Sequence, residues 1–128
     1  MGSGLTLGLS GFTKLATADT GSALPPYLRI APNGGIHLGV PSSEMGQGSH
    51  TGLAMLLAEE LEIEMIQIHS VKTIHHPDFK NAFIASAAPA FGLQITGYST
   101  TIRTWYLPFR KLGATARELL ISAAALKW

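Results

Sequence analysis

The strongest limit on the fold comes from an apolar stripe in the last quarter of the chain. Its members recur at steps of three and four residues, which is the spacing of one face of an α-helix. They are Ile102, Trp105, Phe109, Leu112, Ala116, Leu119, Ala123 and Leu126. We therefore predict a long helix that Ser99 or Thr100 caps at its start. Because proline lacks the backbone N–H that a helix uses, we expect a kink or a break at Pro108.

Shorter patterns upstream supply a surface on which this helix can pack. Leu28–Ile30 and Ile36–Val40 fit the two strands of a hairpin, because the Asn-Gly pair between them supplies the positive φ angles of a tight turn. Leucines spaced by four residues predict a helix over Ser49–Leu61, and Ile66–Val71 fits a third strand. The order ββαβα predicts an α+β fold in two layers, with the helices packed on one face of a small mixed sheet.

Two stretches carry no clear periodicity. Residues 1–26 hold a short apolar run followed by Ala16-Thr17-Ala18, which matches the A-x-A pattern of a signal-cleavage site. We interpret residues 1–26 as a truncated export-signal remnant or disordered leader, ahead of one domain over residues 27–128; a flexible tail is the alternative. Residues 72–95 form a long connection, and such connections in compact domains are usually functional or covered by other protein.

Composition argues against several classes of function. The 128 residues include no cysteine, so the chain cannot hold an iron–sulfur cluster through thiolates or form a disulfide. The nine Lys and Arg are scattered and the net charge is +1, which argues against nucleic-acid binding; the apolar run near the N-terminus is too short to span a membrane. Charged residues make up only 13% of the chain, against about a quarter in an average soluble domain. We therefore expect other protein to cover part of the surface, and the isolated chain to fold only marginally.

Two loops carry the candidate chemistry. In the first, residues 42–51, Gly46 and Gly48 let the backbone approach a ligand, Gln47 offers an amide, and the following helix start offers N–H groups to an anion. The second, residues 96–101, places hydroxyl groups just before the long helix. Neither loop is distinctive alone, and the first lacks the Gly-Lys-Ser/Thr ending of a nucleotide-binding P-loop. If both helices pack on the same sheet, the loops meet and form a neutral, donor-rich site for a phosphate or a polar heterocycle.

The same loops resemble a known family. Glu44-Met45-Gly46-Gln47-Gly48, followed by a helix with Ala58-Glu59-Glu60-Leu61, is similar to the molybdopterin-binding large subunit of the xanthine dehydrogenase and aldehyde oxidase family. The branch that it resembles includes the large, beta chain of isoquinoline 1-oxidoreductase and its bacterial relatives. Further matches are Thr96-Gly97, Ser99-Thr100, Ile102-Arg103 and residues 108–117. The resemblance runs from Tyr27 to Trp128 and implies an N-terminal fragment of such a large subunit, inactive alone; the helical pattern that continues to the last residues fits a truncated chain.

The resemblance implies that the complete enzyme oxidatively hydroxylates an aldehyde or an aromatic N-heterocycle. Its cofactor would be molybdopterin with molybdenum, in the cytosine dinucleotide form. The implied partners are the rest of the large subunit, an iron–sulfur small subunit and, as a further candidate, a cytochrome c subunit; the implied location is the periplasm, reached by the twin-arginine route. The residues expected to contact the cofactor are Met45, Gly46, Gln47, Gly48, Gly97, Ser99 and Thr100. The alternative is a non-enzymatic module of the same fold that binds a partner chain or a phosphate-bearing ligand.

Two departures limit what the resemblance assigns. Tyr98 stands where the family usually has a second glycine, so its phenol could crowd or cap the site. The family's catalytic glutamate lies near the far end of a much longer chain, so no catalytic or metal-binding residue is assigned, and Glu44 is expected to have a structural or cofactor-orienting role. The adjacent His75 and His76 could bind a metal, although solvated loop histidines are more common. His50 could touch a phosphate or cap the first helix.

Overall fold

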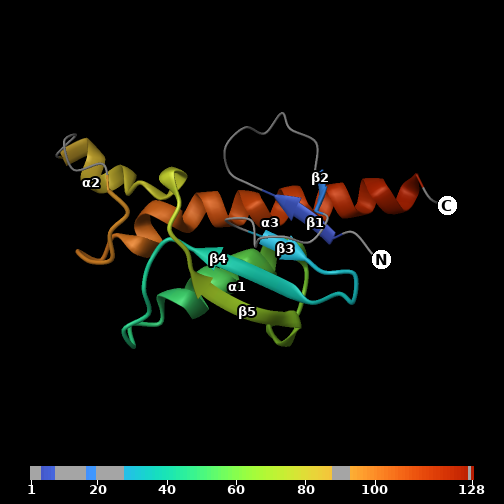
Figure 1. The fold of residues 1–128 in the computed structure, drawn as a ribbon, viewed down its shortest axis with the longest axis horizontal. Helices are drawn as coiled ribbons and strands as arrows, with labels where there is room; N and C mark the ends of the chain where they lie inside the picture. The colour runs from blue at the N-terminus through green and yellow to red at the C-terminus, as the bar shows by residue number, and fades with distance from the viewer. Residues whose placement is uncertain (1–3, 8–16, 20–27, 88–92, 127) are drawn as a thin grey trace.

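The computed structural model describes residues 4–7, 17–19, 28–87, 93–126 and 128. Their strands form one five-stranded mixed sheet in the order β2-β1-β3-β4-β5, antiparallel except for the parallel pair β4–β5. The strands are β1 (Gly4–Leu7), β2 (Thr17–Asp19), β3 (Leu28–Ile30), β4 (Ile36–Val40) and β5 (Ile68–Thr73). The helices are α1 (Ser49–Leu61), α2 (Ala82–Ala87) and α3 (Thr101–Ala125), with 3-10 turns η1 (Met65–Gln67) and η2 (Pro77–Phe79). Figure 1 shows this arrangement, which confirms the predicted α+β class.

The β3–β4 hairpin forms where the sequence predicts it. Leu28 lies opposite Leu38 and Ile30 opposite Ile36, so apolar side chains of both strands share one face. In the turn, Gly34 has a φ of 82°, and the N–H of the next residue donates to Asn33 Oδ1 at 3.0 Å. The Asn-Gly pair therefore reverses the chain as expected.

The sheet extends further toward the N-terminus than expected. β1 pairs antiparallel with both β2 and β3. The expectation that ordered structure begins at Tyr27 is therefore wrong for residues 4–7 and 17–19. Ladder hydrogen bonds join backbone groups, so short strands can enter a sheet without the apolar alternation that sequence patterns detect. The boundary between a leader and a domain after residue 26 stays a prediction.

The part of the chain between α1 and α3 contains more regular structure than the sequence indicates. β5 begins two residues later than predicted, because Met65–Gln67 form η1, in which Gln67 Oε1 accepts a hydrogen bond from Glu64 N at 2.8 Å. Residues 72–95, expected to be an irregular connection, contain η2 and α2. Phe79 of η2 is buried and packs edge-on against Trp105, with 5.1 Å between ring centroids. This connection therefore contributes to the core.

α3 continues through Pro108 without interruption, so the expected break is wrong. A proline inside a helix costs about 3 kcal/mol, because one hydrogen bond is lost and the ring crowds the preceding turn. The side chains of Trp105, Phe109 and Leu112 on either side are buried. Burying each of these contributes about 1.5–3 kcal/mol, so their packing outweighs the cost of the proline.

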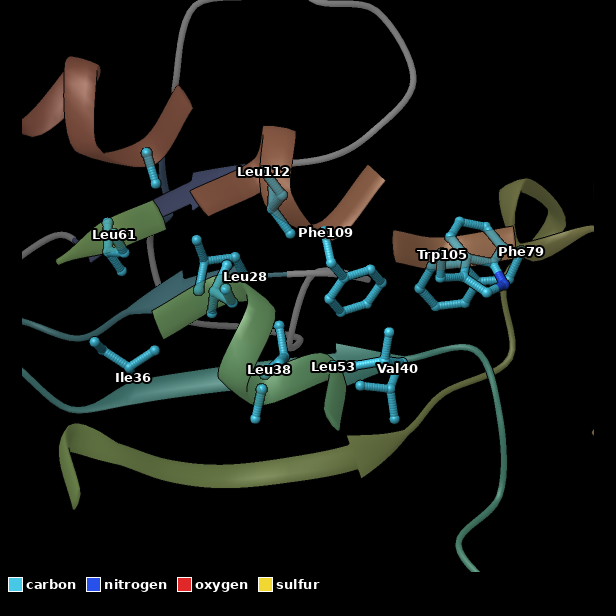
Figure 2. Packing of buried hydrophobic residues seen from close by; sticks show 13 residues of the cluster. Leu28, Ile36, Leu38, Val40, Leu53, Leu61, Phe79, Trp105, Phe109 and Leu112 are labelled. Carbon is cyan, nitrogen blue, oxygen red and sulfur yellow. The ribbon is translucent and has the colours of Figure 1, made fainter. Parts of the chain in front are cut away.

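One hydrophobic core lies between the sheet and the two long helices (Figure 2). Its main members are Leu28, Ile36, Leu38 and Val40 of the sheet, Leu53, Leu57 and Leu61 of α1, and Trp105, Phe109 and Leu112 of α3. Gly113 lets α3 approach α1 closely, since a Cβ at this position would lie 2.7 Å from the carbonyl oxygen of Leu57. The helices thus pack on one face of the mixed sheet, as predicted.

The last turns of α3 lie outside this core. In Figure 1 they extend beyond the ends of α1 and β5. The apolar stripe is buried from Trp105 to Ala116 and half-buried at Leu119, whereas Ile102 at its start and Ala123 and Leu126 at its end are exposed. Within the described residues, no helix has the length and hydropathy needed to cross a membrane.

Candidate functional site

The two sequence-predicted loops meet at one end of the helical layer. The backbone N–H of Ser43 donates to Thr96 Oγ1 at 2.8 Å, joining the first loop to the second. Beside this bond lies a cleft of about 490 Å³. Its lining residues are Met45, Gln47, Gly48, Ser49, Gly52, Thr96, Gly97, Ser99, Thr101 and Ile102. The predicted meeting of the two helix starts is confirmed.

The cleft includes five of the seven residues expected to contact a cofactor. These five are Met45, Gln47, Gly48, Gly97 and Ser99. Gly46 and Thr100 belong to the same loops but do not line the cleft. A direct contact between any of the seven and a cofactor stays a prediction.

Glu44 occupies the start of α1 with its own carboxylate. Oε1 accepts hydrogen bonds from the backbone N–H groups of Gly46 and Gly48, both at 2.9 Å. Oε2 accepts from the N–H of His50 at 3.0 Å and from Ser49 Oγ at 3.4 Å. The hydrogen bonds from His50 and Gly48 N–H lower the pKa of Glu44 to about 2. Three N–H groups at this helix start are therefore already paired with an anion.

The amide of Gln47 is also used inside the loop. Its Oε1 accepts from Met45 N at 2.5 Å, and its Nε2 donates to Ser43 O at 2.8 Å and to Ser49 Oγ at 2.9 Å. Both amide hydrogens are thus committed, and one lone pair of Oε1 is left for a ligand. Met45 has no such ties on its side chain and is 70% exposed at the tip of the loop.

The glycines of the first loop are required by its backbone conformation. Gly46 has a φ of 91° and Gly48 a φ of 75°, in the left-handed region that side chains disfavour. A Cβ at either position would meet nothing within 4 Å. The space around both residues is open, so a ligand can approach this backbone.

The second loop makes a tight turn through two residues with positive φ. Tyr98 and Ser99 have φ angles of 55° and 51°, and Thr100 N donates to Gly97 O at 3.1 Å. The Tyr98 side chain is 78% exposed and does not line the cleft. Whether its phenol caps a bound cofactor stays a prediction. A glycine would adopt this left-handed backbone more readily than tyrosine does.

The side chain of Thr100 stabilises this turn through two hydrogen bonds. It stands at the N-cap of α3, as predicted, but its hydroxyl makes no capping bond to the helix. Instead, Thr100 Oγ1 donates to Gly97 O at 2.8 Å and accepts from Asn81 Nδ2 at 2.6 Å. Thr100 is fully buried, so its support of a ligand would be indirect.

Sequence patterns did not reveal two buried or half-buried amides that hold the second loop. Asn81 is 2% exposed; its Oδ1 accepts from Ile84 N and from Thr104 Oγ1, both at 3.2 Å. Gln94 Nε2 donates to the carbonyl oxygens of Pro41 and Ile74 at 2.7 and 2.6 Å, next to the ends of β4 and β5. The sequence feature that points to this region is the length of the connection over residues 72–95. It predicts a segment that is functional or covered by other protein, but it identifies no particular residue.

The histidines lie outside the cleft. His50 Nε2 contacts Ser42 O at 2.8 Å and Thr73 Oγ1 at 3.1 Å, so the ring faces the end of β5. His76 Nδ1 accepts from the N–H of Asp78 at 3.2 Å and begins η2. Among the described residues, no group of three or more His, Cys, Asp and Glu could hold a metal ion.

Comparison with known proteins agrees with the motifs of these loops. Residues 1–92 match the family described as the molybdopterin cofactor-binding domain. The chain is 28% identical over 126 residues to the beta subunit of isoquinoline 1-oxidoreductase from Brevundimonas diminuta, a match that covers 92% of this chain and 16% of that protein. It is 34% identical over 103 residues to the B subunit of nicotinate dehydrogenase from Pseudomonas putida, covering 79% and 8%. It is 30% identical over 99 residues to the membrane-bound aldehyde dehydrogenase (pyrroloquinoline-quinone) of Gluconacetobacter polyoxogenes, covering 77% and 11%. The chain thus spans only a small part of the curated relatives that it matches.

Proposed function

Because the chain belongs to the molybdopterin cofactor-binding domain family, we propose that its cleft binds part of the molybdopterin cofactor of a molybdenum-dependent oxidoreductase. One observation carries the proposal: the two family-like motifs, 53 residues apart in sequence at Ser43 and Thr96, are joined by a hydrogen bond and together line one cleft. Neither motif alone would indicate a site.

The lining of the cleft fits a polar heterocycle. Ser49, Ser99 and Thr101 bring hydroxyl groups, and Gln47 keeps one acceptor lone pair. Met45 and Ile102 add apolar surface, and the glycine backbone leaves room. A volume of about 490 Å³ is in the range of small-molecule sites. Part of a large cofactor fits such a cleft, with the remainder held by other protein.

The bound cofactor supplies the redox chemistry, which we propose to be oxidative hydroxylation of an aldehyde or an aromatic N-heterocycle. This chain binds and orients; we assign no catalytic residue to it. The relatives named for isoquinoline, nicotinate and aldehyde oxidation support that range of substrates. We propose the cytosine dinucleotide form of the cofactor, and electron transfer through an iron–sulfur subunit, with a cytochrome c subunit as a further candidate partner. The lack of cysteine in this chain is consistent with iron–sulfur clusters on a partner.

We also propose export to the periplasm by the twin-arginine route. The A-x-A pattern at residues 16–18 overlaps β2, so cleavage there would remove β1 from the sheet. Because β1 pairs with β3, cleavage and a complete sheet exclude each other. Cell fractionation with N-terminal sequencing tests the proposal: a periplasmic protein that starts at Asp19 supports export with signal cleavage, and a protein found only in the cytoplasmic fraction contradicts export.

The proposed function is tested by tagging the gene in its host, purifying the product and measuring polypeptide mass and molybdenum content together. We expect stoichiometric molybdenum on a much larger polypeptide that co-purifies with an iron–sulfur subunit. Gln47→Ala should lower the molybdenum content, and Gln67→Ala, a glutamine in η1 outside the cleft, should not. A free protein near 13.6 kDa without molybdenum would contradict the proposal and favour a non-enzymatic binding module.

A further inference from the structure

The cleft presents hydrogen-bonding groups but no charge. Among the described residues that line it, none is acidic or basic. The nearest ionised group in the first loop is the Glu44 carboxylate, which lies at the start of α1 beside the lining residues Gly48 and Ser49. A ligand entering here therefore meets neutral donors and acceptors next to a negative charge.

A helix start with converging N–H groups commonly binds phosphate. Here the N–H groups of Gly46, Gly48 and His50 converge within 2.9–3.0 Å of the Glu44 oxygens. Each oxygen accepts two hydrogen bonds, because Ser49 Oγ supplies the fourth. The start of α1 thus forms an anion-binding site that the Glu44 carboxylate occupies.

We propose that Glu44 is a specificity-determining residue: it fills the anion site at the start of α1, keeps phosphate away from this end of the cleft, and leaves the cleft to an uncharged, hydrogen-bonding heterocycle. This inference rests on the proposed function, because it names the part of the ligand that the cleft accepts. The phosphate-bearing part would lie elsewhere.

Two physical arguments support the role of Glu44. A phosphate would have to displace a carboxylate that is tethered only two residues from the first of its donors, and would then lie beside a displaced negative charge. The pKa of Glu44, lowered to about 2 mainly by the N–H groups of His50 and Gly48, keeps the carboxylate ionised at every physiological pH. The exclusion should therefore not depend on pH near neutrality.

The test is an NMR titration of the ¹⁵N-labelled 128-residue chain at pH 7, at a concentration where sedimentation velocity shows a monomer, with inorganic phosphate and, separately, with pterin. In the wild type we expect pterin, but not phosphate, to shift the amide signals of the cleft. In Glu44→Ala, phosphate should shift the N–H signals of Gly46, Gly48 and His50, with affinity about tenfold above the wild type. Glu59→Gln, which removes a carboxylate at the other end of α1, should behave as the wild type.

Glu44→Gln provides a second variant, because its side-chain oxygen still accepts from the helix start while the charge is lost. We expect it to keep a dispersed amide spectrum and to gain phosphate binding more weakly than Glu44→Ala. Equal phosphate binding by wild type and both variants would overturn the inference, even if pterin binds. Loss of the folded spectrum in both variants would also overturn it, since Glu44 would then be a purely structural residue. Failure of pterin to shift any cleft amide, with the phosphate results as expected, would count against the proposed function and leave the exclusion of phosphate intact.

Discussion

Several polar side chains at the candidate site use their hydrogen bonds to stabilise its two loops. Glu44 and Gln47 use their polar atoms to close the first loop, and Asn81 and Thr100 do the same for the second. A buried polar group contributes little when it is paired but costs about 1–3 kcal/mol when its partner is removed. The geometry of the cleft therefore depends on Gln47, which lines it, and on Glu44, Asn81 and Thr100, which do not.

Asn81→Ala should lower the free energy of unfolding by about 1–3 kcal/mol, because the N–H of Ile84 loses its acceptor and the buried hydroxyl of Thr100 loses the hydrogen bond from Asn81 Nδ2. Urea unfolding followed by circular dichroism measures this. Asn33→Ala, which removes the same amide from an exposed turn, is the matched control and should cost less than about 1 kcal/mol. Equal losses for the two variants would show that burial of the Asn81 amide has no special weight.

Tyr98→Gly should raise the free energy of unfolding by about 0.5–1 kcal/mol. The left-handed backbone at φ 55° costs a residue with a side chain about 1–2 kcal/mol, and glycine removes this cost. Glycine also gives the unfolded chain more conformational entropy, which offsets about 0.5–1 kcal/mol of the gain. Thermal unfolding tests it against Tyr106→Gly, the same replacement inside α3, which should destabilise. A lower melting temperature for Tyr98→Gly would mean that the exposed ring makes a contact worth more than the backbone strain.

The carboxyl of Glu44 predicts an acid-dependent part of the stability. Its pKa falls from an ordinary 4.5 to about 2 in the folded state, mainly through the N–H groups of His50 and Gly48. A depressed pKa stabilises the fold above about pH 4.5, and this contribution is lost as the pH falls through about 2. Urea midpoints measured across this window should fall less steeply for Glu44→Gln than for Glu59→Gln. Parallel curves would contradict the hydrogen bonding of Glu44 to the helix start.

At the scale of elements, the pair α1 and α3 positions the site. Both helices begin at the cleft, and their contact is close at Gly113, where the carbonyl oxygen of Leu57 and the Cβ of Glu60 leave no room for a side chain. This contact fixes the separation of the two helices and hence the distance between the two loops.

Gly113→Ala should destabilise the chain by about 1–3 kcal/mol through overpacking, although alanine favours a helix by about 1 kcal/mol relative to glycine. The added Cβ would lie 2.7 Å from the Leu57 carbonyl oxygen and 2.9 Å from Glu60 Cβ. Gly52→Ala is the control within α1, since its Cβ would meet only the Ile102 side-chain end, at 3.1 Å, which can move. Denaturant unfolding should show a clearly larger loss for Gly113→Ala; the reverse order would mean that the helices can separate at little cost.

At the scale of the whole molecule, apolar surface gathers where α3 leaves the core. Leu120 and Ile121 are 41% and 50% exposed, and Leu126 is 91% exposed. Such a group on a domain with few charges favours association or a cover of other protein. That this chain folds only marginally alone stays a prediction.

The isolated chain should therefore self-associate at micromolar to millimolar concentrations, as seen by sedimentation velocity. Replacing both Leu120 and Ile121 by Glu should shift it toward monomer, because the substitutions break the exposed apolar group. Leu107→Glu, which charges a 61% exposed leucine outside this group, should have less effect. A monomeric wild type with a sharp, reversible melt would contradict both the association and the marginal stability.

Local patterns in the amino-acid sequence were sufficient for α1 and α3, the central hairpin and the two glycine- and hydroxyl-rich loops, but not for α2. α1 has the predicted bounds, because leucine spacing reports which face of a helix is buried. The hairpin follows from Asn33-Gly34, since that pair suits positive φ angles. These features depend on residues that are close together in the sequence, so predicting them does not require knowing which distant segments pack together.

Long-range packing supplied what those patterns could not. β1 and β2 join the sheet through backbone pairing, and α3 passes through Pro108 because buried side chains on both sides hold it. Asn81 supports the site because its side chain, between η2 and α2, hydrogen-bonds to Thr100 and Thr104 at the start of α3. The Glu44 carboxylate turned back onto the helix start that had been expected to bind an external anion. In each case the outcome depends on which groups meet across the fold and compete for the same partners, and residue spacing along the chain does not contain that information.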